Sequence, residues 1–362
     1  MHTRHVFVIA FSVLIMCTLV GCSDKSTPPQ SAQYAAGTAQ LLSVGSPSKD
    51  EDPSIVVTRD GRIIVAWFSD RGGNSDIYMA STGDGINWTT PVRITYNSGG
   101  DFHPTIIQDD NGTYHLTWFR WTALYVGHIM YNSSIDGVTW DTTGEVTVTT
   151  APDVDDWEPT MVASPGDTLL ITFASVKRHM PDSTSAVYLS RRLPGNTSWE
   201  TPTLLGPFAS SDKHTSLPNI QRTSNTYYIV AVNTDTLQAI PWLNSRSWLS
   251  YATSTDGISW AGPFPITNDS GNVVHLFPAL YEKNANNWSL VWLSTRTTAT
   301  PAVYELPFSQ IDSYPSGITA LTVLGDGYSH KIAETPTPGI YIGAWVQGAD
   351  TALDIYYRIF HF

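Results

Sequence analysis

Residues 134–140 read Ser134-Ile135-Asp136-Gly137-Val138-Thr139-Trp140, and the same polar turn returns as Ser254-Thr255-Asp256-Gly257-Ile258-Ser259-Trp260. An earlier copy reads Thr82-Gly83-Asp84-Gly85-Ile86-Asn87-Trp88, and a shortened one ends in Ser198-Trp199. In such a turn the aspartate accepts backbone N–H bonds, the glycine supplies a positive φ, and the tryptophan packs between strands. We therefore interpret these aspartates as structural residues and not as catalytic ones.

A longer repeat surrounds these turns. A proline precedes a large apolar residue by 14 positions in five places, and a lysine takes its place in an eroded sixth copy: Pro53 and Trp67, Pro104 and Trp118, Pro159 and Phe173, Pro218 and Val232, Pro278 and Trp292, Lys331 and Trp345. The copies follow one another at steps of 51 to 60 residues. A turn residue lies inside each pair, so each copy predicts two strands, then a third before the polar turn and a fourth after it.

Four strands in each of six copies predict an all-β fold, a six-bladed β-propeller of four-stranded antiparallel blades. The last copy offers three strands, around His330–Thr335, Ile340–Val346 and Leu353–Phe360. We expect Gln40–Val44 to supply its outer strand, which closes the ring and leaves no exposed sheet edge. Five blades with an appended sheet, as in some arabinan-cleaving enzymes with a short Asp-Gly-x-x-Trp turn, is the alternative.

The N-terminal residues have the pattern of a bacterial lipoprotein signal. Val6–Val20 is an apolar run of 15 residues behind Arg4, which is too short to span a membrane. It ends in Leu19-Val20-Gly21-Cys22, which matches the lipobox in which the cysteine becomes acylated. We predict a signal peptide at 1–21, a flexible tether at 22–36 from lipidated Cys22, and a propeller at 37–362. The expected location is the bacterial cell envelope, at the outer membrane.

Charge and cysteine content limit the partners. Removing residues 1–21 leaves 18 Lys and Arg against 32 Asp and Glu, a net charge of −14, which disfavours nucleic acid and anionic lipid surfaces. The lipid would then be the membrane contact. Cys17 leaves with the signal and Cys22 is lipidated, so no disulfide is expected. We expect a monomer without a cofactor or resident metal.

The repeat resembles the sialidase-like propellers with Asp-box (BNR) repeats, over nearly all of residues 37–362. The resemblance implies a pocket around the central opening, on the face where the first strands begin and the second strands end. Charged and aromatic residues aimed at that face suit a carbohydrate partner. As substrate-binding candidates we name Arg71, Arg296, Arg120, Trp121, Asp52, His103, His214, His275, His330 and Trp157.

Active sialidases use three arginines, a tyrosine nucleophile helped by a glutamate, and an aspartic acid/base. Tyr328 resembles the nucleophile, Arg296 and Arg71 resemble two of the arginines, and Asp76 follows Arg71 as the acid/base would. The chain departs from the family in Glu51-Asp52-Pro53, where an arginine should stand, in Leu217, which replaces a glutamate, and in Asn233-Thr234-Asp235, which lacks an arginine. Losing one buried partner of a charge pair costs about 2–5 kcal/mol, so sialidase activity should be absent or slow.

Three functional readings follow from these residues. The first is an enzyme acting on another glycan, with Tyr328, Asp76 and Glu158 as catalytic candidates. Asp76 with Asp52 or with Glu158 could form a hydrolase pair, or Tyr328 beside a histidine could abstract a proton as a lyase does. The second is a non-catalytic propeller that binds a glycan or protein. The third places His103, His214, His275 and His330 around a metal ion on the axis.

Overall fold

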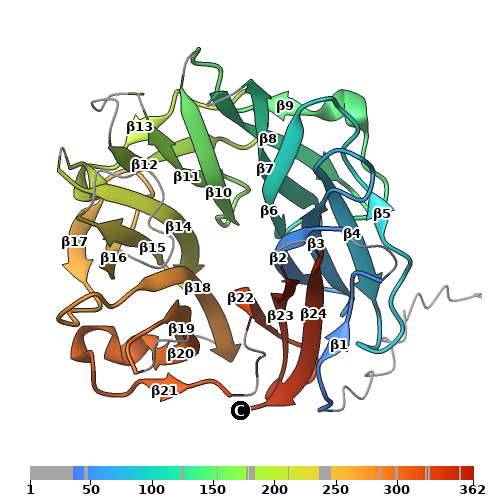
Figure 1. Ribbon diagram of the computed structural model, residues 1–362. Helices are drawn as coiled ribbons and strands as arrows, with labels where there is room; N and C mark the ends of the chain where they lie inside the picture. Colours follow the sequence, from blue (N-terminus) through green and yellow to red (C-terminus); the bar gives the residue numbers. More distant parts are fainter. Residues whose placement is uncertain are drawn as a thin grey trace, which may run out of the picture.

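The chain forms a ring of antiparallel sheets around a central axis. The computed structural model describes residues 36–44, 48–123, 126–152, 154–176, 178, 184–210, 212–235, 246–284, 287–297, 301–322, 324, 327–349 and 352–362. Four of its sheets have four strands, and one has eight. The eight-stranded sheet divides into two four-stranded arrays, joined by a parallel pairing of Asp155 with Gly127. We call the six arrays blades 1 to 6 (Figure 1).

Blades 1 to 3 take up the first half of the described chain. Blade 1 comprises β2 (Asp50–Val57), β3 (Ile63–Ser69), β4 (Asp76–Thr82) and β5 (Val92–Arg93). Blade 2 comprises β6 (Gly100–Gln108), β7 (Tyr114–Ala123), β8 (Val126–Ser134) and β9 (Val146–Thr147), with the 3-10 helix η1 (Thr142–Gly144) before β9. Blade 3 comprises β10 (Asp155–Ala163), β11 (Leu169–Val176), β12 (Ser185–Arg192) and β13 (Thr203–Leu204), followed by η2 (Gly206–Phe208).

Blades 4 to 6 complete the ring. Blade 4 comprises β14 (His214–Thr223), β15 (Thr226–Thr234), β16 (Ser247–Ser254) and β17 (Ala261–Pro265). Blade 5 comprises β18 (His275–Asn284), β19 (Asn287–Ser294), β20 (Ala302–Pro307) and β21 (Thr319–Ala320), with η3 (Phe308–Ser313) before β21. Blade 6 comprises β22 (Tyr328–Glu334), β23 (Ile340–Ala349) and β24 (Ala352–His361), and its fourth strand is β1 (Gln40–Leu41).

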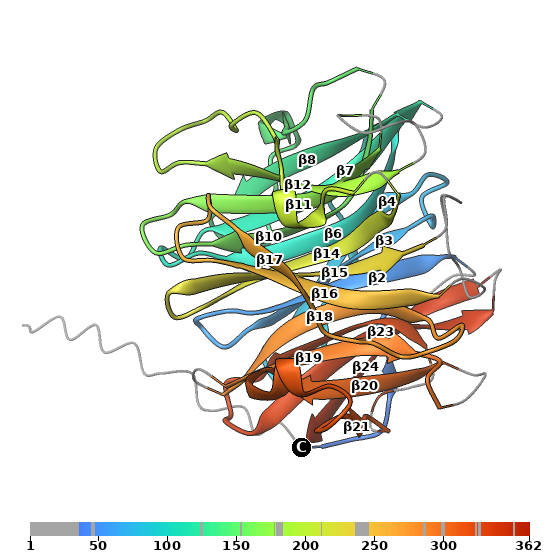
Figure 2. The ribbon, with the colours of Figure 1, turned by 90° about the vertical axis from the view of Figure 1, so that its left-hand side faces the viewer.

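The first strand of every blade lies innermost. Each contacts the first strand of the next blade, and β22 of blade 6 contacts β2 of blade 1. The strands run between the two faces of the ring, as Figure 2 shows. Side chains on the first strands therefore meet at the axis, and the connections that lead into them lie on one face.

The N-terminal strand closes the ring as the sequence predicts. Gln40 pairs with Tyr357 and Leu41 with Tyr356 in an antiparallel register. The next residue, Leu42, is buried and packs with apolar side chains of blades 6 and 1. This pairing covers the edge of β24, which would otherwise expose unpaired backbone groups. The predicted signal peptide, most of the tether and Cys22 lie outside the described residues. Within those residues, no helix has the length and apolar character needed to cross a membrane.

Apolar layers between adjacent blades form the core. The large residue of each repeat is fully or almost fully buried: Trp67, Trp118, Phe173, Val232, Trp292 and Trp345. The tryptophans of the polar turns extend these layers, since Trp88 of blade 1 contacts Tyr357 of blade 6 with ring centroids 5.1 Å apart. Trp199 of blade 3 packs against Tyr131 of blade 2 in the same way, at 5.2 Å. Each of these two tryptophans therefore joins its blade to the preceding one.

The aspartates of the polar turns have the structural contacts that the sequence predicts. Oδ1 of Asp136 accepts the backbone N–H groups of Val138 and Thr139 at 2.8 and 2.7 Å. Asp256 accepts the same pair of bonds from Ser259 and Ile258, which lowers its pKa to about 2. These turns follow the third strand of their blade, away from the innermost strands.

Candidate functional site

All six innermost strands share one backbone irregularity. Each contains a β-bulge, and one residue in each bulge has a positive φ: Asp52 (52°), His103 (48°), Glu158 (54°), Leu217 (48°), Phe277 (52°) and Ser329 (55°). Non-glycine residues rarely adopt this conformation, and such residues gather at functional sites. In blades 1 to 5 the residue is followed by the repeated proline, which strands tolerate at bulges.

The position of the bulge in blade 6 shows that the pairing of Lys331 with Trp345 in the sixth copy is wrong by one residue. The repeated proline corresponds to His330 and not to Lys331, because the hairpin of blade 6 is one residue longer. Six residues separate the paired Glu334 and Tyr341, whereas five separate the equivalent Val57 and Ile63. The ring of His330 is buried and stacks on Trp345 at a centroid distance of 6.1 Å.

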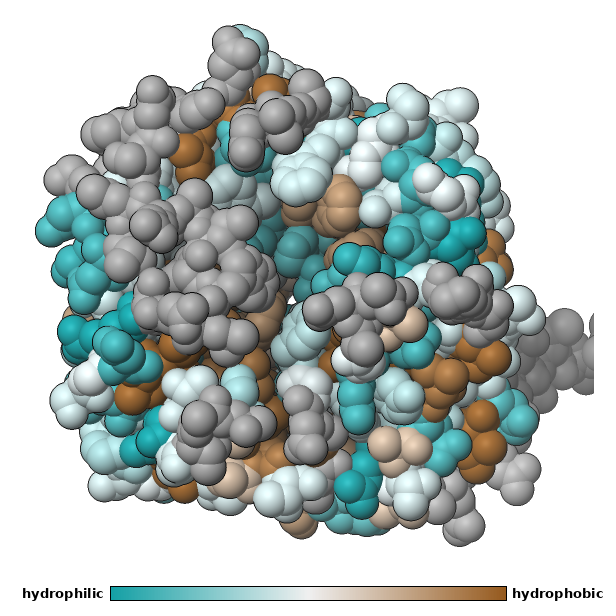
Figure 3. Space-filling view, in the orientation of Figure 1, coloured by the Kyte–Doolittle hydropathy of each residue, from teal (hydrophilic) through white to brown (hydrophobic). Residues whose placement is uncertain are grey.

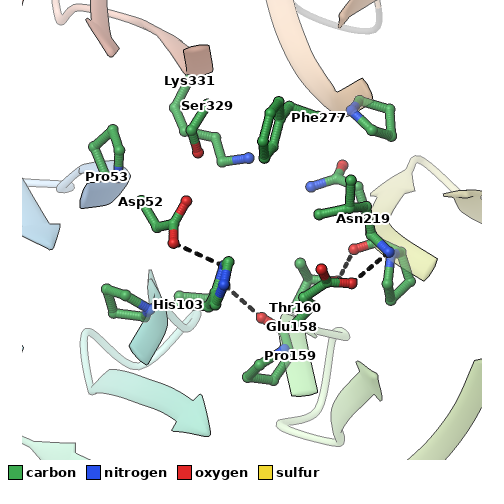
Figure 4. Close-up of a pocket in the computed structure, with 15 residues that line it drawn as sticks. Asp52, Pro53, His103, Glu158, Pro159, Thr160, Asn219, Phe277, Ser329 and Lys331 are labelled. Carbon is green, nitrogen blue, oxygen red and sulfur yellow. Dashed lines mark hydrogen bonds and ion pairs between the residues drawn. The ribbon is translucent and has the colours of Figure 1, made fainter. Parts of the chain in front are cut away.

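The six bulge residues surround one cavity on the axis. It has a volume of about 50 Å³ and is lined by all six of them together with neighbouring residues such as Asn219 and Lys331. The face drawn in Figure 3 is hollowed near its centre. Figure 4 shows the charged side chains of blades 1 to 3 on one side of the cavity and Phe277 with Lys331 on the other. The cavity is therefore polar on one side and partly apolar on the other.

Asp52 and His103 form an ion pair inside this cavity. Nδ1 of His103 lies 3.0 Å from Oδ2 of Asp52, and the two side chains point toward one another in Figure 4. Burial alone would raise the pKa of Asp52, but the attraction of His103 outweighs it and lowers that pKa below its ordinary value. The pKa of His103 is raised, because Asp52 and then Glu158 outweigh the effect of its burial. Asp52 is therefore held as a carboxylate.

Glu158 is perturbed in the opposite direction. Burial raises the pKa of Glu158 above its ordinary value, although His103 and a hydrogen bond from the backbone N–H of Leu217 oppose the shift. That N–H donates to Oε2 of Glu158 at 2.6 Å. Trp157 beside it also hydrogen bonds to this carboxyl group. One cavity thus holds a carboxyl group whose pKa is lowered and another whose pKa is raised.

Tyr328 has a carboxylate beside it at the edge of the cavity. Its hydroxyl donates to Oε2 of Glu51 at 2.9 Å, and its ring lies 5.7 Å from that of Phe277. Burial is the main cause that raises the pKa of Glu51, and the negative charge of neighbouring Asp52 raises it further. The sequence suggested a histidine as the base for Tyr328, whereas the structure places Glu51 there.

Two of the predicted arginines contact buried carboxylates within their own blades. Arg71 lies 2.7 Å from Asp50, and Arg120 lies 2.7 Å from Asp101 and 2.9 Å from Glu145. Neither guanidinium lines the axial cavity. Sequence reasoning overlooked the signal for these pairs, which is an aspartate three residues before the repeated proline: Asp50, Asp101 and Asp156. Arg178 pairs with Asp156 in blade 3 in the same way.

Asp76 and Arg296 also lie apart from the axial cavity. Asp76 is fully buried and lies 2.7 Å from Arg93 of the same blade. Arg296 lies 3.7 Å from Asp269, and its guanidinium lies over the ring of Tyr314. Asp76 therefore does not meet Asp52 or Glu158, and the carboxyl groups that share the cavity are Asp52 and Glu158.

The four candidate histidines occupy four different positions of the repeat. His103 is the bulge residue of blade 2, whereas His330 follows the bulge residue of blade 6. His275 lies two residues before the bulge residue of blade 5, and its Nδ1 accepts the indole N–H of Trp292 at 3.1 Å. His214 lies three residues before that of blade 4 and contacts Ser185. The structure therefore does not bring the four rings together, and the described residues contain no group of three or more metal-ligating side chains.

The two candidate tryptophans lie next to residues of the cavity. Trp157 immediately precedes Glu158 and is partly buried. Trp121 is 47% exposed, and its ring lies 5.2 Å from that of Phe102, which precedes His103. Neither indole lines the axial cavity itself, and Trp121 lines a separate groove.

Comparison with known proteins finds solved structures of similar fold at low sequence identity. No family model and no curated protein sequence matches this chain. A protein of unknown function from Dyadobacter fermentans DSM 18053 has a TM-score of 0.69 at 13% identity, over 91% of this chain and 99% of that one. The α-L-arabinanase of Penicillium chrysogenum and the GH93 α-L-arabinofuranosidase of Fusarium graminearum, both solved with arabinobiose, each reach 0.66 at 12% identity, over 90% of this chain and 98% of theirs. The chain is thus a β-propeller that resembles the GH93 enzymes in fold.

Proposed function

We propose that this six-bladed propeller binds the end of a neutral glycan, such as an arabino-oligosaccharide, in its axial cavity and hydrolyses it with Glu158 and Asp52. One observation carries the proposal, namely that the two carboxyl groups share a cavity and their pKa values are shifted in opposite directions. Pairs of titratable groups whose environments separate their pKa values are characteristic of acid/base sites.

Each side chain of the cavity takes a distinct role in this proposal. Glu158, favoured in its protonated form, donates a proton to the leaving oxygen of the glycosidic bond. Asp52, favoured as a carboxylate, faces the sugar ring as nucleophile or base and stabilises the positive charge that develops on it. His103 positions Asp52 and keeps it ionised through their 3.0 Å contact.

Two of the arginines named as ligands for an acidic sugar are not free to bind one, which is why we choose a neutral substrate. Recognition of an acidic sugar usually relies on guanidinium groups that are free to pair with its carboxylate. Arg71 and Arg120 are instead paired with buried aspartates of this chain. The structural neighbours solved with arabinobiose make arabinose chains the first substrates to test.

Glu158→Gln and Asp52→Asn test the proposal on the full chain. We expect the wild-type protein to release arabinose or short products from arabino-oligosaccharides. Each substitution should lower kcat by roughly 10²–10⁴-fold, as loss of general acid/base catalysis does. Glu200→Gln is the control, because Glu200 pairs with Arg191 in the outer part of blade 3 and should not affect turnover. Turnover that survives both substitutions in the cavity would contradict the assignment.

Tyr328 remains an alternative nucleophile, because Glu51 lies within hydrogen-bonding distance of its hydroxyl. Tyr328→Phe removes that hydroxyl and keeps the ring. If Glu158 and Asp52 carry the reaction, this variant should retain most of the wild-type rate. A loss as large as that of Glu158→Gln would instead assign Tyr328 to the reaction.

The second candidate is a propeller that binds a glycan without cleaving it. Leu217 and Phe277 favour it, because they place apolar side chains at two of the six cavity positions. Isothermal titration with arabino-oligosaccharides, followed by product analysis of the same samples, separates the two candidates. Heat of binding without product supports the second candidate, and product formation excludes it.

We further propose that the protein is a lipoprotein of the bacterial envelope, anchored through Cys22. The lipobox-like Leu19-Val20-Gly21-Cys22 supports this. Metabolic labelling with a fatty-acid analogue should mark the wild-type protein and should not mark Cys22→Ser. A labelled Cys22→Ser variant would contradict the anchor.

A further inference from the structure

We infer that Trp121 is a second sugar-binding platform, which holds the part of an oligosaccharide that extends out of the axial cavity over blade 2. The inference rests on the proposed function, since it assumes that the cavity binds the end of a glycan. It adds that the natural ligand is a chain that continues beyond the cavity.

A row of contacting aromatic rings connects the cavity to Trp121. The ring of His103, which lines the cavity, stacks on Phe119 with centroids 5.4 Å apart and planes inclined by 25°. Phe119 contacts Trp121 at 5.8 Å, and Phe102 contacts Trp121 at 5.2 Å. Two ring contacts thus separate the indole of Trp121 from His103 in the cavity.

The exposure of Trp121 distinguishes it from the rest of this row. Phe119 is buried, whereas Trp121 is 47% exposed. The other exposed aromatic side chains of the described chain are Tyr96, Phe264 and Phe362, and the aromatic contacts found for them lie outside this row. Trp121 thus offers an exposed aromatic surface that ring contacts link to His103 of the cavity.

A groove runs beside the exposed indole. It has a volume of about 530 Å³ and is lined by Asn97, Ser98, Gly99, Gly100, Arg120, Trp121 and Thr122. A Cβ atom on Gly99 would lie 2.6 Å from the backbone oxygen of Trp121, so a glycine is required for this close approach. The side-chain amide of Asn74 donates to the backbone oxygens of Asn97 and Gly99 at 3.1 and 2.9 Å, which holds the loop in place. The groove is therefore formed before any ligand arrives, which favours affinity.

The size of the groove and the charges beside it indicate which ligand it binds. The axial cavity, at about 50 Å³, has less room than the groove, at about 530 Å³, so an oligosaccharide whose end enters the cavity has most of its length outside it. Arg120, the charged residue of the groove, is paired with both Asp101 and Glu145. A neutral, flat-faced sugar chain matches an aromatic platform whose neighbouring charge is already balanced.

Trp121→Ala, Trp121→Phe and the control Phe264→Ala test the inference. Phe264 is likewise exposed and packs on an aromatic ring, but it belongs to blade 4. The dissociation constants of arabinobiose and of a longer arabino-oligosaccharide are measured by calorimetry on the full chain, with each variant also prepared in a Glu158→Gln background so that the ligand is not consumed. We expect Trp121→Ala to weaken binding of the longer ligand by about threefold to tenfold, the size of one aromatic contact, and to leave arabinobiose unchanged. Trp121→Phe should retain most of the affinity, and Phe264→Ala all of it.

The outcomes separate this inference from the proposed function. If the wild-type chain binds neither ligand, the proposed function is wrong. If it binds both and Trp121→Ala binds the longer ligand as tightly as the wild type does, the platform is wrong while the proposed function stands. An equal loss of affinity for both ligands also overturns the platform, because Trp121 would then contact the part of the ligand that arabinobiose already contains. Unchanged thermal unfolding of the variants establishes that they fold.

Discussion

At the scale of single residues, the cavity contrasts two carboxyl groups that occupy the same position in two different copies of the repeat. Asp52 and Glu158 occupy equivalent bulge positions in blades 1 and 3, and His103 of blade 2 lies between them in the ring. The backbone treats the three positions alike, with φ values of 52°, 54° and 48°. The difference in their ionisation therefore arises from their neighbours, chiefly the direct contact of His103 with Asp52.

The pH dependence of hydrolysis follows from these shifts. Activity requires Asp52 ionised and Glu158 protonated, so kcat/KM should rise as Asp52 loses its proton and fall as Glu158 loses its proton. Because the pKa of Asp52 is lowered and that of Glu158 is raised, the range of activity should be wider than ordinary carboxyl groups would allow. The profile of kcat/KM between pH 3 and 9 measures it. A profile that rises steadily toward alkaline pH would contradict the assignment of Glu158 as acid.

The ion pair of His103 and Asp52 should also make stability depend on pH. The folded-state pKa of His103 is raised above its ordinary value of 6.5. As long as Asp52 is ionised, the contribution of His103 is therefore complete below that value and is lost as the pH rises through the folded-state pKa of His103. His103→Gln should consequently lower the free energy of unfolding more at pH 6 than at pH 9, as measured by urea denaturation. An equal loss at both pH values would show that the charge of His103 does not matter.

At the scale of elements, the sequence predicted the strands better than the orientation of the side chains on them. Repeats and turn residues located the strand pairs in every blade, and the three strands of blade 6 lie where the sequence placed them. The bulge escaped sequence reasoning, because the residue before a proline normally adopts an extended conformation. For that reason His214 and His275 were expected at the cavity of blades 4 and 5, where Leu217 and Phe277 lie instead.

The buried pairs between arginine and aspartate explain why charged residues recur in the blades. Asp101 is fully buried, and it accepts hydrogen bonds from the indole of Trp118 at 2.9 Å and from Arg120 at 2.7 Å. Removing one partner of such a pair leaves a buried charge without compensation. A charged residue near the pocket face can thus stabilise the fold instead of binding a ligand. Sequence alone does not distinguish these two roles.

Asp101→Ala should therefore lower the free energy of unfolding by about 3–5 kcal/mol. Asp110→Ala is the matched control, because Asp110 pairs with Arg59 at the surface, where both side chains are more than half exposed. That substitution should cost no more than about 1 kcal/mol. Urea denaturation of both variants measures the difference. Similar losses in the two variants would contradict a structural role for the buried pairs.

At the scale of the whole molecule, ring closure was predictable because the last repeat lacked one strand. The arrangement of the charged groups was less predictable, because it depends on contacts between segments that are far apart in the sequence. Tyr328 and Glu51, for example, are brought together by the junction of blades 6 and 1. We therefore expect the N-terminal strand, which closes the same junction, to contribute to stability.

Leu42→Ala tests this junction. Leu42 is buried against blades 6 and 1, and its backbone N–H donates to Ile355 at 2.8 Å. The substitution should lower the free energy of unfolding by about 2–5 kcal/mol, as for other buried leucines. Leu41→Ala, next to it and 40% exposed, should have a much smaller effect. Equal effects in urea denaturation would mean that the ring does not depend on this contact.

The six bulges have a consequence for how such a protein can change over evolution. Each of them presents one side chain to the same small space, and all six have nearly the same backbone conformation. Replacing Asp52, His103, Glu158 or Ser329 would change the chemistry of the cavity, whereas Leu217 and Phe277 also pack into an apolar cluster of the core. The fold of the ring can therefore be kept while the side chains around the axial cavity change with function.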